Sequence, residues 1–184
     1  MPDAGRRILL TTAGLLATQA VGSLFNVWYN LTHIRPLLSD AELASFMRAI
    51  AIFNAIVYPV ASVVWIRVMW SLARAYDSPK RLLRARQRAI NLPWWVIGIG
   101  LPSWLLTIPA LLWELHRSSP AVDPQVNVHI PISVLIASLI ALAHGFFVVE
   151  LIAQRLWYPV LFRDAAPSDV RGTLPPVSYT HLRA

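Results

Sequence analysis

The sequence has no cysteine and few acidic residues: nine Asp and Glu stand against sixteen Lys and Arg in 184 residues. The absence of cysteine excludes disulfides, thiolate metal sites and a cysteine nucleophile. The chain also lacks a Gly-rich phosphate loop and the G-x-S-x-G and H-E-x-x-H signatures of hydrolases and metalloproteases. We therefore predict no catalytic set, no cofactor and no metal site within these residues.

Apolar residues dominate the chain instead. They make up 57% of the sequence, which exceeds the composition of an ordinary soluble domain. A bilayer core of about 30 Å is crossed by about 20 helical residues, and four apolar segments reach that length. We expect spans at residues 8–30, 48–72, 93–115 and 131–160. The predicted fold class is all-α, a polytopic membrane protein with four transmembrane helices.

Local signals refine the ends of these spans. Ser39-Asp40-Ala41-Glu42 has the S-x-x-E form of a capping box, so the second helix is expected to begin at Ser39, ahead of the membrane. Pro93 suits the first helical position of the third span. Pro59, Pro102 and Pro109 fall inside spans, where a membrane bundle tolerates them as kinks.

The net charge of +7 does not point to nucleic acid, because the cations flank the apolar segments and so set topology. Eleven cations are expected on one side of the membrane: Arg6, Arg7, Arg74, Lys80, Arg81, Arg84, Arg86, Arg88, Arg155, Arg163 and Arg171. Only Arg35, Arg48 and Arg117 are expected on the other side. The excess predicts a multi-pass protein of the plasma or inner membrane with both termini cytoplasmic.

The densest run of charge is the predicted cytoplasmic loop at residues 75–91. Together with the residue before it, it contains six cations: Arg74, Lys80, Arg81, Arg84, Arg86 and Arg88. One interpretation is a binding surface for anionic lipid head groups in the surrounding bilayer. The other is a plain topology determinant with no ligand. The plain topology determinant is the preferred interpretation of the sequence.

Three titratable residues inside the expected spans are candidates for a specific role: Arg67, Glu150 and His144. Arg67 and Glu150 should lie at similar depth, since the second and fourth spans run in the same direction. We hypothesise that they form an interhelical ion pair. The alternative is that each side chain snorkels to the interface. For His144, a neutral, hydrogen-bonded side chain packed in the bundle is preferred over a metal, haem or proton-relay role.

Two stretches support a family resemblance: RARQRAINLPWWVIGIGLPSWLLTIP at residues 84–109 and HIPISVLIASLIALAHGFFVVELIAQRLWYPVLF at residues 129–162. Together they resemble the N-terminal membrane region of bacterial class III adenylate and guanylate cyclases. The resemblance implies a six-helix membrane module before a HAMP linker and a cytoplasmic cyclase domain. It also implies a homodimer, because the cyclase site forms between two chains. The family's metal-binding aspartates have no counterpart here.

The C-terminal residues suggest that the chain is incomplete. PVSYTHLRA at residues 176–184 looks like translated sequencing adapter, and residues 166–175 read as a linker. We therefore expect residues 1–165 to be the membrane anchor and sensory input module of a truncated signalling protein, with no enzyme activity in this fragment. The alternative is a complete small integral membrane protein, such as a transporter subunit or accessory protein.

Overall fold

The computed structural model describes residues 4–119 and 121–170, and every regular element within them is a helix. Four continuous helices are long and apolar enough to cross a membrane: Ala4–Leu37, Asp40–Ala73, Leu92–Ser118 and Val126–Leu161. Each contains one of the predicted spans. The prediction of an all-α chain with four helices of membrane-spanning length is thus confirmed.

The first two helices extend past the predicted spans. Helix α1 (Ala4–Tyr29) continues through a π turn, η1 (Asn30–Ile34), and a short 3-10 turn, η2 (Arg35–Leu37). Helix α2 (Asp40–Ala73) begins at the predicted capping box. There the Glu42 carboxylate accepts the backbone N–H of Ser39 at 2.8 Å, while the Ser39 hydroxyl accepts the N–H of Glu42.

The segment predicted as a charged loop is largely helical. After the 3-10 turn η3 (Ala75–Asp77), helix α3 (Pro79–Ile90) begins at the N-cap Ser78, whose hydroxyl accepts the backbone N–H of Arg81. Its buried residues are Ala85, Ala89 and Ile90. The loop prediction was wrong because small alanines form much of the apolar stripe, and the arginines between them masked its helical spacing.

The last long helices contain proline without ending there. Helix α4 (Leu92–Ser118) contains Pro102 and Pro109, and α5 (Val126–Ile152) contains Pro131. Helix α5 continues through a second π turn, η4 (Ala153–Trp157), into α6 (Tyr158–Leu161). A 3-10 turn, η5 (Pro167–Asp169), lies in the predicted linker, and residues 176–184 fall outside the described residues.

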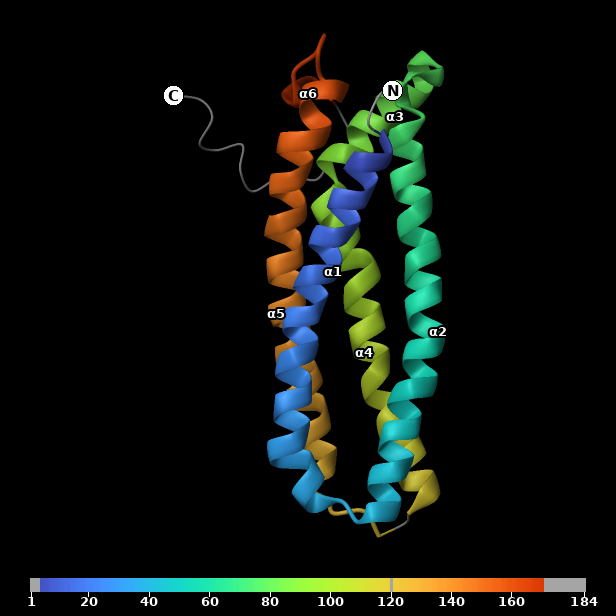
Figure 1. Cartoon of the computed structure of the whole chain (residues 1–184), viewed down its shortest axis with the longest axis vertical. Helices are drawn as coiled ribbons and strands as arrows, with labels where there is room; N and C mark the ends of the chain where they lie inside the picture. Colours follow the sequence, from blue (N-terminus) through green and yellow to red (C-terminus); the bar gives the residue numbers. More distant parts are fainter. Residues whose placement is uncertain (1–3, 120, 171–184) are drawn as a thin grey trace.

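The four long helices form an elongated bundle (Figure 1). Helix α5 packs against both α1 and α4, whereas α2 packs mainly on α4. We call one end of the bundle the basic end; it holds the start of α1 together with η3, α3 and α6. The other, the far end, holds η1, η2 and the start of α5. The two chain segments before α2 and before α5 both turn at the far end.

Helices α1 and α5 meet along a stripe of small side chains, which we call the small-residue seam. It consists of Gly14, Thr18 and Gly22 on α1, with Ala137, Ala141 and Gly145 on α5. Both sets repeat every four residues, so each lies on one helix face. A Cβ atom at Gly22 would lie 2.6 Å from the carbonyl oxygen of Ala137 and 2.6 Å from Cβ of Ala141. The backbones therefore approach as closely as in small-xxx-small membrane helix pairs.

Helices α2 and α4 share buried clusters near both of their ends. At the basic end, Trp65, Met69 and Leu72 of α2 share a buried cluster with Leu92 and Val96 of α4. At the far end, a second cluster joins Phe46 and Ala49 of α2 to Leu111 and Leu115 of α4. Between these clusters, residues 50–64 and 97–110 include no buried side chain. The side chains in the middle of this pair are therefore half-buried or exposed.

Candidate functional site

Arg67 and Glu150, the predicted ion pair, lie in different surroundings. Arg67 is exposed on α2, whereas Glu150 is 6% exposed on α5, and its Oε1 accepts Nε2 of Gln154 at 3.4 Å. The helices with extensive contacts to α5 are α1 and α4, not α2. The arrangement gives the two side chains no shared helix interface, and the ion pair stays a prediction.

His144 is exposed on α5, so the expected packing is wrong, whereas the expected hydrogen bond is present. Its Nδ1 lies 2.7 Å from the carbonyl oxygen of Ile140 on the same helix. Because a carbonyl only accepts, Nδ1 donates the proton in this bond. Among the described residues, no group of three or more His, Cys, Asp or Glu side chains could hold a metal ion.

Helix α1 accepts hydrogen bonds from tryptophans of the other three long helical segments, an arrangement we call the indole ladder. Trp157 donates to Thr11 at 3.0 Å, Trp65 to Thr12 at 3.1 Å, and Trp104 to Gln19 at 3.2 Å. Thr11 is fully buried and donates its own proton to the carbonyl of Arg7 at 2.7 Å. Indole N–H groups need acceptors once removed from water, so these bonds fix how α1 sits in the bundle. Sequence analysis missed this role of the Thr and Gln side chains.

The seam ends in a closed ring of polar side chains at the far end. Asn26 donates to Ser133 at 2.8 Å, Ser133 donates to the amide oxygen of Asn30 at 3.1 Å, and Asn30 donates to the amide oxygen of Asn26 at 3.0 Å. Beside it, the Tyr29 hydroxyl lies 2.9 Å from Nδ1 of His129. These bonds join α1 to α5 at the π turn η1.

Three of the five cations of α3 share one face of the helix. Arg81, Arg84 and Arg88 are spaced three and four residues apart on one face. With Ser71 and Arg74 at the end of α2, they line an open cavity of about 180 Å³, which we call the basic hollow. Within it, Arg81 forms an ion pair with Asp77. The predicted charge run thus forms a concave surface rather than a spread of separate cations, and Lys80 and Arg86 lie outside its lining.

Arg86, on another face of α3, helps to hold the end of the last helix. We call this arrangement the exit clamp. Arg86 donates from Nε to the carbonyl of Leu161 at 2.7 Å and pairs with Asp164. The hydroxyl of Tyr76 donates to the carbonyl of Val160. Carbonyls in the last turn of a helix lack partners within that helix, so side chains from η3 and α3 satisfy them here. The clamp thus connects η3 and α3 to the C-terminal end of α6.

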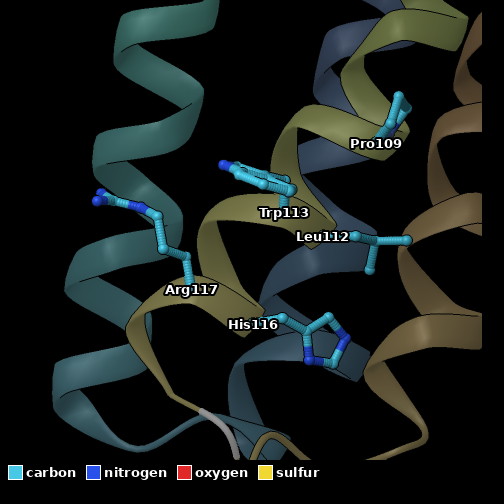
Figure 2. Close-up of a pocket in the computed structure, with 5 residues that line it drawn as sticks. All are labelled: Pro109, Leu112, Trp113, His116 and Arg117. Atoms are coloured by element: carbon cyan, nitrogen blue, oxygen red, sulfur yellow. The ribbon is translucent and has the colours of Figure 1, made fainter.

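A further pocket of about 570 Å³ lies near the far end, lined by Pro109, Leu112, Trp113, His116 and Arg117. Figure 2 shows all five residues on α4, with Trp113 and Arg117 pointing toward α2 and Leu112 toward the opposite side. A pocket with side chains from one helix has no facing wall. It resembles the aromatic and basic anchoring of a helix at a membrane interface more than an enclosed ligand site.

The chain matches no protein-family model. It also matches no curated protein and no solved structure. The cyclase resemblance of the two sequence stretches therefore stays a prediction.

Proposed function

We propose that residues 1–165 are the membrane anchor and sensory input module of a signalling protein. The exit clamp is the observation that supports this proposal most directly. The helix leaving the bundle is held by Tyr76 of η3 and Arg86 of α3, which lie outside the four long helices at the basic end. A shift of α3 would therefore act on α6 without passing through the whole bundle, and small shifts of packed helices are a common means of switching.

The resemblance favours adenylate or guanylate cyclase as the output, working as a homodimer. The expected orientation, with both termini cytoplasmic in the cell membrane, is supported by the distribution of charge. Arg6, Arg7 and α3 lie at the basic end, while Arg35 and Arg117 lie at the far end. Such an excess of cations marks the cytoplasmic side. An output domain following α6 would then be cytoplasmic as well.

The proposal is tested with the gene product read through its natural downstream sequence. Cyclase activity is measured in membranes for the unchanged protein, for Arg86→Gln and for Lys80→Gln. Arg86→Gln removes the Asp164 ion pair and is expected to change activity several-fold, because it loosens the exit. Lys80→Gln removes the same charge from α3 outside the clamp and should leave activity within twofold.

Two results would contradict the proposal. Cyclase activity unaffected by deleting residues 1–165 would reduce the module to an anchor. A native stop codon directly after Ala184 in source DNA would remove the attached output domain, and a complete small membrane protein would then be the better interpretation. A topology assay with reporters fused before α1 and after α6 tests the orientation separately.

A further inference from the structure

The basic hollow concentrates positive charge that the described residues do not neutralise. Arg74, Arg81, Arg84 and Arg88 line it, and Asp77, paired with Arg81, is the one carboxylate that the described contacts place beside them. No described contact gives Arg84 or Arg88 a carboxylate partner. Like charges converging on a concave surface repel one another, and a bound anion relieves that repulsion.

The chemistry of the lining fits a phosphate group. A guanidinium presents a planar fork of N–H donors that matches phosphate oxygens in pairs. Three such forks lie on one face of α3, and Arg74 reaches the hollow from the end of α2. The volume of about 180 Å³ is several times that of a water molecule. Ser71 adds a small side chain whose hydroxyl already donates to the carbonyl of Val68.

The surface next to the hollow indicates that the phosphate belongs to a lipid. Val63, Ile66, Trp70 and Arg74 follow one another at helical spacing along a single face of α2. Ile66 is 60% and Trp70 54% exposed, and the Arg74 guanidinium lies 4.7 Å from the Trp70 ring centre. Tryptophan marks the head-group level of a bilayer. The exposed Arg67 lies on the same face between Ile66 and Trp70. Exposed apolar side chains with one further cation thus run from membrane depth to the arginines of the hollow.

We propose that the basic hollow binds the phosphate of an anionic phospholipid, whose acyl chains lie along Val63, Ile66 and Trp70. This site would supply the stimulus of the module, and in that respect it rests on the proposed function. Lipid binding itself does not, because the arginines that line the hollow all lie within the described residues and need no output domain. Binding and signalling can therefore fail separately.

The test compares lipid binding by two variants of the purified 184-residue chain in detergent. Native mass spectrometry measures binding of phosphatidylglycerol and of phosphatidylcholine to the unchanged protein, to Arg84→Gln/Arg88→Gln and to Lys80→Gln. We expect phosphatidylglycerol to bind in preference to phosphatidylcholine. The double variant should bind phosphatidylglycerol about 25-fold more weakly, about fivefold for each cation removed. Lys80→Gln should change binding by less than about twofold.

A competition titration with inorganic phosphate distinguishes a bound lipid from a free anion. If inorganic phosphate displaced phosphatidylglycerol at comparable concentration, the hollow would be a phosphate site and the lipid assignment would be overturned. Equal loss of binding in Lys80→Gln and in the double variant would also overturn it, because general surface charge would then explain the preference. Helical circular dichroism and thermal unfolding of both variants show whether they remain folded. Should the double variant misfold, Ser71→Trp, which fills the hollow without altering charge, is expected to reduce binding by at least tenfold, and unchanged binding would refute the site.

Discussion

The two helix pairs of the bundle are joined in different ways. Along the small-residue seam, α1 and α5 touch through Gly22, Ala137 and Ala141 at backbone distance. Helices α2 and α4, in contrast, meet in two buried clusters separated by residues 50–64 and 97–110, which include no buried side chain. The seam is continuous along its length, and the second pair is held at its ends.

The difference follows from side-chain size. Lipid tails are as apolar as leucine, so large apolar residues gain little by leaving lipid for another helix. Small residues allow close backbone approach and continuous van der Waals contact. The α1–α5 pair should therefore be rigid, while the centre of the α2–α4 pair can separate without losing buried contacts.

The largest effect is expected from Gly22→Ala in the seam. The added Cβ would lie 2.6 Å from the Ala137 carbonyl oxygen, which belongs to backbone and cannot rotate away. We expect a loss of about 2 kcal/mol in the free energy of unfolding. Gly98→Ala on α4 is the control, because no atom lies within 4 Å of its Cβ position. Denaturant unfolding of the detergent-solubilised protein compares them, and equal stability of the two variants would show that the seam is not tightly packed.

A smaller effect is expected from the indole ladder. Thr11→Val and Trp157→Phe, singly and combined, form a double-mutant cycle for a bond whose acceptor is fully buried. We expect a coupling free energy of about 1 kcal/mol, near the upper part of the range for membrane helices. The cycle for Thr12 and Trp65, where the contact is part-buried, should give less. A larger coupling at Trp65 would mean that α1 is held more strongly by α2 than by the end of α5.

The smallest effect is expected in the middle of α2. Ile56 is 61% exposed, so Ile56→Ala should change the free energy of unfolding by less than about 0.5 kcal/mol. Val68 is 5% exposed in the basic-end cluster, and Val68→Ala should cost about 1 kcal/mol. Thermal unfolding at matched detergent concentration measures both. A greater loss for Ile56→Ala would mean that the middle of α2 is covered.

The sequence predicted what depends on length and local signals. Apolar length located the four spans, and Ser39 with Glu42 predicted the start of α2. The cap at Ser78 followed by Pro79 could have revealed α3, and the four-residue spacing of Gly14, Thr18 and Gly22 could have revealed the seam. The sequence therefore contains local signals for both α3 and the seam.

The side of each helix that contacts its neighbours could not be predicted in the same way. Side chains that face lipid and side chains that face another helix are both apolar, so hydrophobic periodicity gives no direction. Glu150 and His144 illustrate this: six residues correspond to about 240° around a helix, and one side chain is buried while the other is exposed. The choice of α1 and α4 as neighbours of α5 likewise depends on three-dimensional fit.

The π turn η4 lets the chain hold one extra residue at the exit of the bundle. A π turn contains one residue more than the α-helical turn it replaces, and it lies between α5 and the clamped α6. Because the turn absorbs that residue within a single revolution, the carbonyls of Val160 and Leu161 keep the azimuth that faces Tyr76 and Arg86. A deletion placed in the regular helix α5 would instead rotate both carbonyls by about 100° relative to the bundle. The exit of the chain therefore tolerates a change of length in the turn and not in the helix before it.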